Sequence, residues 1–99
     1  MKLDWSRRSL ADIDNIKAYI RTSDPPAAYR VFTAIRATAD RLRRFPRIGP
    51  PGRQQGTREI VVRGTPYLIV YRLAGTTIEI LRVLHGRQDW PATEPVTTR

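Results

Sequence analysis

The sequence predicts an α+β domain in which a helical hairpin packs on one small antiparallel β-sheet, in the order β-α-α-β-β-β. Two amphipathic helical patterns fill the first half of the chain, and three short apolar strand patterns fill the second half. A segment rich in proline and glycine separates the halves, as expected when helices and strands are segregated along a chain. With 99 residues and no internal repeat, the chain is long enough for one domain. We expect this domain over residues 1–90 and an irregular C-terminal tail over residues 91–99.

The first helix is predicted over residues 7–21, after a short extended segment at residues 2–5. Ser6 is suited to cap its N-terminus. The apolar side chains of this segment fall on one half of a helix, which is the pattern of an amphipathic helix. They are Leu10, Ile13, Ile16, Tyr19 and Ile20.

The second helix is predicted from Pro25 to about Phe45. Asp24 followed by Pro25 is a strong helix start, and Pro46 ends the helix. Its apolar stripe is narrower and consists of Val31, Phe32, Ile35, Ala39, Leu42 and Phe45. The other side carries Arg30, Arg36, Arg41, Arg43 and Arg44. Because the link between the helices is short, they are expected to form an antiparallel hairpin.

Three strands are predicted after the loop at residues 46–56. They cover residues 57–63, 66–74 and 76–86, with turns at Gly64-Thr65 and Ala74-Gly75, and form an antiparallel meander.

The strands are apolar on both faces, although a two-helix hairpin covers only one face of a sheet. Alternation places Tyr67, Ile69 and Tyr71 on one face of the middle strand and Leu68 and Val70 on the other. In the last strand, Ile78, Ile80 and Leu84 are expected to oppose Leu81 and Val83. A second apolar face of this size indicates a partner that covers it. The alternative is that the 46–56 loop and the tail, through Trp90, cover it.

The charge indicates a polyanionic or acidic partner. Eighteen Lys and Arg residues against nine acids give a net charge of +9, and sixteen of the eighteen are arginine. Between Arg41 and Arg63 there are seven arginines and one acid, Glu59. Arginine suits phosphate and carboxylate pairing, so nucleic acid, a machine bound to nucleic acid, and an acidic protein are candidate partners. A solvated arginine-rich surface is the alternative. Glu59 is expected to form a surface ion pair with Arg58 or Arg72.

Other function classes are disfavoured. There are no cysteines and one histidine, His85, so neither disulfides nor a metal site are expected, and no cofactor motif is present. No apolar run reaches the length of a membrane span and the N-terminus has no signal-peptide pattern, so the expected location is the cytoplasm.

Four stretches together resemble the RelE/ParE superfamily, the toxins of bacterial type II toxin–antitoxin modules. They are SRRSLADIDNIKAYI, LRRFPRIGPPGR, REIVVRGTPYLIVYR and IEILRVLHGR. The resemblance covers roughly residues 1–90 and implies a small antiparallel sheet on a helical hairpin. It also implies a cognate antitoxin, ParD- or RelB-like, that wraps the toxin, and operator DNA bound through the antitoxin complex.

The superfamily divides by target, and this sequence departs from the RelE branch. RelE-like members cleave messenger RNA in the ribosome with basic side chains and a tyrosine or histidine, and need no metal. The positions matching their lysines and arginines are here Glu59, Val61, Leu68 and Gln88, and the late tyrosine is absent. A nuclease would therefore depend on His85, Arg87, Arg58, Arg63 and Arg72. The opening SRRSLADIDNI, the GPPGR loop and the IEILRVLH strand instead resemble ParE-like members, which poison DNA gyrase.

The ParE resemblance implies a target contact at the end of the last strand and just beyond it. We expect Arg87, Gln88, Asp89 and Trp90 to bind the target, and His85 either to act chemically or simply to close the strand through backbone hydrogen bonds. Trp90 packing onto the sheet edge is the structural alternative. The expected antitoxin contacts are Leu68, Val70, Arg72, Leu81, Val83, Arg41 and Arg44. A decayed toxin that only binds its antitoxin is a third hypothesis.

Overall fold

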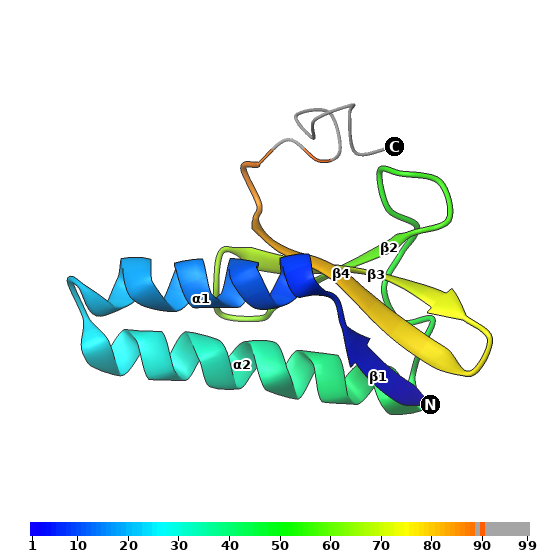
Figure 1. Cartoon of the computed structure of the whole chain (residues 1–99), viewed down its shortest axis with the longest axis horizontal. Helices are drawn as coiled ribbons and strands as arrows, with labels where there is room; N and C mark the ends of the chain where they lie inside the picture. The colour runs from blue at the N-terminus through cyan, green and yellow to red at the C-terminus, as the bar shows by residue number, and fades with distance from the viewer. Residues whose placement is uncertain (89, 91–99) are drawn as a thin grey trace.

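Two antiparallel helices pack on one four-stranded sheet (Figure 1). The computed structural model describes residues 1–88 and residue 90, so Asp89 and the predicted tail over residues 91–99 lie outside the described residues. The elements are β1 (Lys2–Trp5), α1 (Arg7–Arg21), α2 (Pro25–Arg44), β2 (Arg58–Val61), β3 (Tyr67–Ala74) and β4 (Thr77–His85). The predicted fold class and element order are confirmed.

The two helices begin where their capping residues predict. Ser6 Oγ accepts a hydrogen bond from the backbone N of Ser9 at 3.0 Å, and Asp24 Oδ1 accepts one from Ala27 N at 3.2 Å. These side chains satisfy amide groups that a helix N-terminus leaves without a partner. α2 ends at Arg44, with Phe45 as its C-cap and Pro46 after it.

The sheet has the strand order β1-β4-β3-β2 and is mixed. β2, β3 and β4 form the predicted antiparallel meander. β1, however, lies beside β4 and runs parallel to it, so the expectation of an entirely antiparallel sheet needs this correction. A parallel pair of strands needs a long connection between them. The helical hairpin, β2 and β3 together supply this connection between β1 and β4.

A β-bulge in β4 changes which of its side chains face the helices. Val70 pairs with Arg82 and Tyr71 with Ile80, so Leu81 is an extra residue without a partner of its own. As a result Val83 joins Ile78 and Ile80 in the core beneath the helices. Leu84 pairs with Leu68, on the other face. The expected grouping of Leu84 with Ile78 and Ile80, and of Val83 with Leu81, is therefore wrong, because strict alternation does not survive a bulge.

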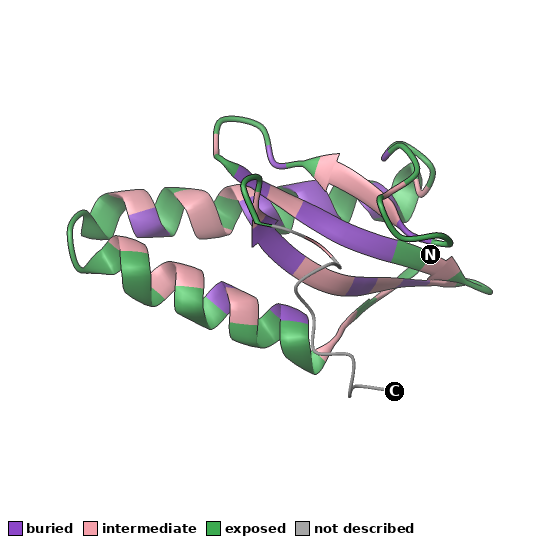
Figure 2. Cartoon of the chain, turned by 90° about the horizontal axis from the view of Figure 1, so that it is seen from above, coloured by how far each residue is buried: buried purple, intermediate pink, exposed green. Residues whose placement is uncertain are grey.

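The core lies between the hairpin and the sheet, where the most buried segments meet (Figure 2). Its centre is made by aliphatic residues of α2, β3 and β4 together with Tyr71. The fully buried members include Ile35, Leu42, Ile69, Tyr71, Ile78 and Ile80.

α1 continues along the edge of β4 where β1 ends. Ser6 N donates to Ile80 O at 3.0 Å, and Ser6 Oγ donates to Leu81 O at 3.0 Å. Six residues later, Asp12 Oδ2 accepts from Val83 N at 2.8 Å. The side chains of α1 thus replace a neighbouring strand for the second half of β4, which is how the helix and the end of β4 are held together.

Candidate functional site

His85 closes the sheet at the end of β4. Its backbone N donates to Gln88 Oε1 at 2.8 Å, and its carbonyl accepts from Gln88 N at 2.9 Å. The ring stands edge-on to Tyr67, its partner in the register, with ring centroids 5.6 Å apart. Nδ1 accepts from Arg87 N at 3.1 Å, which leaves the proton of a neutral imidazole on Nε2. The ring therefore helps to form the turn that follows β4.

A shallow cleft of about 390 Å³ lies beside His85. It is lined by Asn15, Ile16, Tyr19, Pro66, Tyr67, His85 and Gln88. Burial raises the pKa of the Tyr67 hydroxyl above its usual 10.0, and the nearby Tyr19 raises it further. A phenol with a raised pKa is protonated at neutral pH, so the Tyr67 hydroxyl does not act as a general base beside His85.

The five residues that a nuclease would use do not converge. Arg72 ion-pairs with Glu79, and its strand position is five residues from Tyr67, the partner of His85, or about 17 Å along the strand. Arg58 Nη1 is engaged by the carbonyl oxygens of Gly49, at 2.7 Å, and Arg47, at 3.3 Å.

Arg63 and Arg87 lie at the same end of the sheet as His85, because Arg63 follows β2 in the turn to β3 and Arg87 follows β4. Both are exposed, and neither forms an ion pair within residues 1–88 and 90. The structure thus joins two of the arginines with the histidine and separates the other two from it.

Tyr71 is also committed to structure. Its buried hydroxyl donates to Pro46 O at 2.8 Å and accepts from Gly49 N at 3.0 Å. Burial raises its pKa, while the Gly49 hydrogen bond and the charge of Arg58 act in the opposite direction. A Cβ on Gly49 would lie 2.8 Å from the Tyr71 hydroxyl oxygen, so only glycine fits there. Tyr71 and Arg58 together hold the start of the proline-rich loop.

The sheet face away from the helices carries an acid and apolar side chains where the RelE pattern has cations. Glu59 is opposite Val70 and Val61 is opposite Leu68, so these four share a face. Val70 and Leu84 are almost completely buried, while Val61 is 68% exposed. The face is thus partly covered within the chain itself, which was the alternative to an open face awaiting a partner.

Two arginines lie over this covered part, each held by a carboxylate. Arg53 Nε donates to Glu59 Oε2 at 3.1 Å, and Arg53 Nη1 donates to Gln88 O at 3.1 Å. Arg82 makes a two-pronged pair with Asp12, at 2.9 and 3.0 Å, and its guanidinium lies 5.8 Å from the centre of the Trp90 ring. The expected ion pair of Glu59 with Arg58 or Arg72 is therefore wrong. Arg58 lies on the other face of β2, and Arg72 is taken by Glu79.

The seven predicted antitoxin contacts do not form one surface. Val70 and Val83 are buried on opposite faces of the sheet, and Leu68 and Leu81 are partly buried. Arg72 is exposed at the far end of β3. Arg41 and Arg44 are exposed on α2, away from the outer sheet face.

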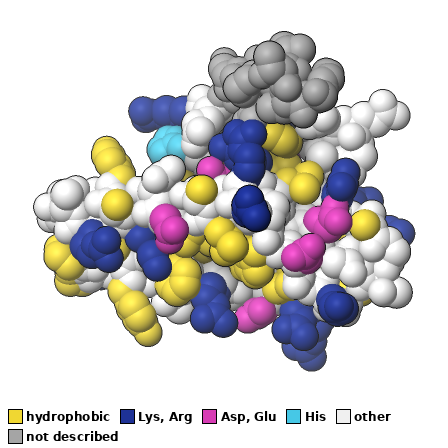
Figure 3. Space-filling view, in the orientation of Figure 1, with side chains coloured by type: hydrophobic (Ala, Val, Ile, Leu, Met, Phe, Trp, Pro, Cys, Tyr) yellow, Lys and Arg dark blue, Asp and Glu magenta, His cyan; other side chains and the backbone are white. Residues whose placement is uncertain are grey.

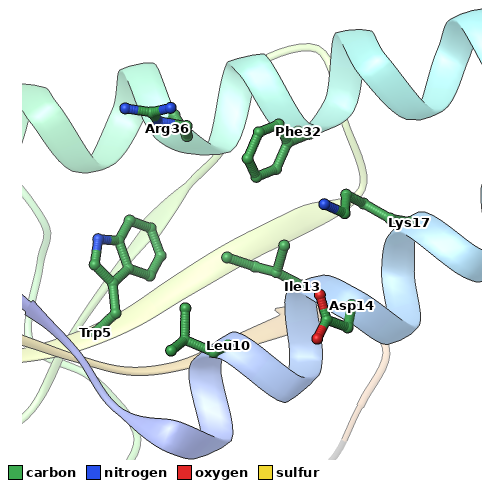
Figure 4. Close-up of a pocket in the computed structure, with 7 residues that line it drawn as sticks. All are labelled: Trp5, Leu10, Ile13, Asp14, Lys17, Phe32 and Arg36. Atoms are coloured by element: carbon green, nitrogen blue, oxygen red, sulfur yellow. The ribbon is translucent and has the colours of Figure 1, made fainter.

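An apolar groove between α1 and α2 was not predicted. Figure 3 shows hydrophobic side chains gathered between the two helices, with charged side chains along the rims. The groove encloses about 470 Å³ and is lined by Trp5, Leu10, Ile13, Asp14, Lys17, Phe32 and Arg36 (Figure 4). A second hollow of about 320 Å³ continues it past Lys17 and Phe32, toward Arg21, Pro25, Ala28 and Tyr29.

The groove has an apolar floor and a mostly basic rim. In Figure 4 Leu10 and Ile13 of α1 point toward Phe32 of α2. Lys17 Nζ lies 4.5 Å from the centre of the Phe32 ring, and Leu10 is 49% exposed. The sequence held a signal for this groove. The apolar stripe of α1 spans half the helix, which is wider than one packing contact needs, so its margins are left at the surface.

Two general features complete the description. Within residues 1–88 and 90, no three His, Cys, Asp or Glu side chains gather in a way that would hold a metal ion. In the same part of the chain, no helix has the length and apolar character that crossing a membrane requires.

Comparison with known proteins places the chain in a family. Residues 3–90 match the model of the ParE toxin of the type II toxin–antitoxin system parDE. The chain is 43% identical to a putative toxin, Y4kP, of Sinorhizobium fredii over 90 residues, covering 91% of this chain and 93% of the relative. It is 36% identical to the toxin RelE2 of Caulobacter vibrioides, over 83% of this chain and 91% of the relative.

Solved structures agree with the sequence relatives. A chain of the chromosomal ParDE system from P. aeruginosa superposes with a TM-score of 0.81 at 26% identity, covering 86% of this chain and 95% of that one. A chain of the toxin–antitoxin complex RelBE2 from Mycobacterium tuberculosis gives a TM-score of 0.64 at 31% identity, covering 85% and 95%. With a family match across most of its length, this chain belongs to the ParE toxin family of type II toxin–antitoxin systems.

Proposed function

We propose that this toxin inhibits DNA gyrase in the cytoplasm, without a cofactor, through the segment that follows β4. Arg87, Gln88 and Trp90 of this segment, with Asp89 outside the described residues, form the target contact. The observation that carries the proposal is the dispersal of the nuclease candidates: Arg58 and Arg72 are engaged elsewhere, far from His85. Tryptophan and arginine are also the residues that most often dominate protein interfaces.

The chemistry of RNA cleavage supports the same choice. Cleavage needs a base for the 2′-OH, cations at the phosphorus and an acid for the leaving oxygen. The outer face, where the RelE resemblance would place its cations, has Glu59, Val61 and Leu68. Arg53 on this face is held in an ion pair with Glu59, and the apolar side chains of Val61 and Leu68 do not stabilise the charge of a phosphate.

Expression without an antitoxin tests the proposal. We expect induction of the SOS response, filamentous cells and double-strand breaks, with messenger RNA intact. Purified toxin added to gyrase should inhibit supercoiling of relaxed plasmid. Truncated messages and an immediate arrest of translation, with intact DNA, would identify the ribosome as the target instead. Normal growth would identify a remnant that only binds its antitoxin.

His85→Ala separates the two mechanisms further. A histidine that only forms the turn contributes one hydrogen bond, from Arg87 N to its Nδ1, so the variant should lose part of its toxicity and keep the rest. Arg87→Ala should lower toxicity, because this side chain is exposed beside the turn. If His85→Ala alone abolishes toxicity while circular dichroism and the melting temperature stay normal, a chemical role for this histidine replaces the binding mechanism.

We further propose that the cognate antitoxin neutralises the toxin by placing an amphipathic helix in the groove between α1 and α2. The floor of Leu10, Ile13 and Phe32 suits apolar side chains at helical spacing. The rim carries Lys17, Arg21 and Arg36, which suit acidic side chains on the flank of that helix. The likeness to chains of ParDE and RelBE2 complexes supports an antitoxin partner. Operator DNA would be bound through the antitoxin in the complex.

A further inference from the structure

The segment after β4 is held by two arginines that come from different elements and lie over the same face of the sheet. Arg82 lies on β4 and reaches Trp90, and Arg53 lies in the proline-rich loop and reaches the carbonyl of Gln88. Both side chains have limited freedom, because each is fixed by a carboxylate. Asp12 of α1 fixes Arg82, and Glu59 of β2 fixes Arg53.

The Asp12–Arg82 pair is held by several hydrogen bonds. Both carboxylate oxygens of Asp12 accept from the guanidinium, at 2.9 and 3.0 Å, and Oδ2 also accepts from Val83 N at 2.8 Å. The two side chains are only 14% and 12% exposed, so water screens the pair little. A planar guanidinium held in two places presents a flat face, and Trp90 lies within cation–π distance of it.

The Glu59–Arg53 pair fixes the second arginine. Glu59 Oε2 accepts from both the backbone N of Arg53, at 2.9 Å, and its Nε, at 3.1 Å. Because side chain and backbone are held by one carboxylate, Arg53 Nη1 is aimed at Gln88 O, 3.1 Å away. Gln88 in turn closes the turn at His85 through Oε1.

We propose that Asp12, Arg82, Glu59 and Arg53 are positioning residues for target binding, which hold Gln88 and Trp90 in the position that the target recognises. This rests on the proposed function, since it takes the segment after β4 as the target contact. The four residues do not touch the target themselves. A prearranged segment loses less conformational entropy on binding, which is how remote ion pairs raise affinity. Trp90 Nε1 is buried and makes no hydrogen bond with the described residues, so its placement depends on packing against Arg82.

The chain supplies a matched control. Arg72 and Glu79 form a third arginine–carboxylate pair on the same sheet, at the other end of β3 and β4 from His85. Asp12→Asn, Glu59→Gln and Glu79→Gln each remove one negative charge at nearly constant shape. The first two break a pair that is joined to Gln88 or Trp90, and the third breaks a pair at the other end of β3 and β4.

The first readout is the environment of Trp90 in the free toxin. The chain has two tryptophans, Trp5 and Trp90, so a Trp5→Phe background leaves Trp90 as the only indole. We expect acrylamide to quench Trp90 more strongly in Asp12→Asn and Glu59→Gln, and equally in Glu79→Gln and the parent. Unchanged quenching in Asp12→Asn and Glu59→Gln would overturn the positioning role. Circular dichroism confirms that each variant is folded.

The second readout is gyrase inhibition by the same three variants with Trp5 intact. Asp12→Asn and Glu59→Gln should each raise the toxin concentration needed by about tenfold, equivalent to about 1.4 kcal/mol, while Glu79→Gln matches the parent. Asp12→Glu, which keeps the negative charge, should inhibit gyrase better than Asp12→Asn does. If quenching rises but inhibition is unchanged, the Asp12–Arg82 and Glu59–Arg53 pairs are merely structural and the inference fails, although gyrase remains the target. If the unaltered toxin does not inhibit gyrase, both the proposed function and this inference are wrong.

Discussion

Tyr71 shows how much a single side chain decides in a chain of 99 residues. Sequence alternation placed it on one face of the strand with Tyr67 and Ile69, and in the structure its side chain is fully buried in the core. Its hydroxyl reaches past the core to the loop, and satisfies a donor and an acceptor of the backbone at Gly49 and Pro46. The loop that carries Arg53 to the outer sheet face begins at this anchor, so a core residue also supports the target-binding segment.

Tyr71→Phe should destabilise the protein by about 1–3 kcal/mol, because it leaves buried backbone groups without partners. Chemical denaturation followed by circular dichroism measures the change. Tyr29→Phe is the matched control, since Tyr29 is 73% exposed on α2, and it should alter stability by less than about 0.5 kcal/mol. Equal stability of Tyr71→Phe and the parent would mean that the loop is anchored by Arg58 alone.

The same hydroxyl predicts a dependence of stability on alkaline pH. Burial raises the pKa of Tyr71 above 10.0, so above that pH the unfolded chain loses this proton before the folded one does. The stabilising contribution is complete below pH 10 and is lost as the pH rises through the raised pKa. The difference in unfolding free energy between the parent and Tyr71→Phe should therefore shrink at alkaline pH. Parallel stability curves would contradict the assignment.

At the scale of elements, α1 contributes to two of the surfaces described above. One side of it lines the groove with Leu10 and Lys17, and another side caps the edge of β4 with Asp12. The helix therefore lies between the surface proposed for the antitoxin and the ion pair proposed to hold Trp90. Both surfaces depend on the same 15-residue helix and on its cap, Ser6.

Two charge-introducing variants distinguish the possible antitoxin surfaces. Leu10→Glu places a carboxylate on the groove floor and should weaken antitoxin binding at least about tenfold. The substitution removes an apolar contact and adds a charge that antitoxin binding would bury. Val61→Glu makes the same kind of change on the outer sheet face, beside Leu68, and should leave binding unchanged. Titration calorimetry with the antitoxin reads out both. Loss of binding in Val61→Glu alone would restore the sheet face as the antitoxin site.

At the scale of the whole molecule, the net charge of +9 acts at a distance. Arg41 and Arg44 are exposed, and Arg41, nine residues after Phe32, lies about half a turn around α2 from the groove. Side chains placed there steer an acidic partner without contacting it in the groove.

Arg41→Gln combined with Arg44→Gln lowers the net charge from +9 to +7, since 9 − 2 = 7. We expect slower association with an acidic antitoxin at low ionic strength and an unchanged dissociation rate, measured by stopped flow. The difference should vanish at high salt, where the charges are screened. Faster dissociation would instead make these arginines direct contacts.

The predicted helices and strands are confirmed where neighbouring residues determine where an element begins and ends. Ser6, Asp24-Pro25 and Pro46 marked the helix ends, and the predicted turns at Gly64-Thr65 and Ala74-Gly75 lie between the observed strands. The candidate sites held less well. The turn at His85 was expected as the structural alternative, because a histidine beside glycine at a strand end readily bonds nearby backbone. The groove and the contacts of Arg82 and Arg53 with the segment after β4 were missed, since each joins residues far apart in sequence, such as Asp12 with Arg82 and Arg53 with Gln88.

The sequence by itself determined the helices, the meander, the basic charge and the resemblance to the toxin family, because each depends on residues close together or on composition. Only the tertiary structure decided that β1 runs parallel to β4 and that Leu81 bulges, which turns Val83 toward the core. Only it decided which arginines are engaged and which are exposed. These outcomes depend on pairing between distant segments, where a shift of one residue reverses the face of every side chain beyond it.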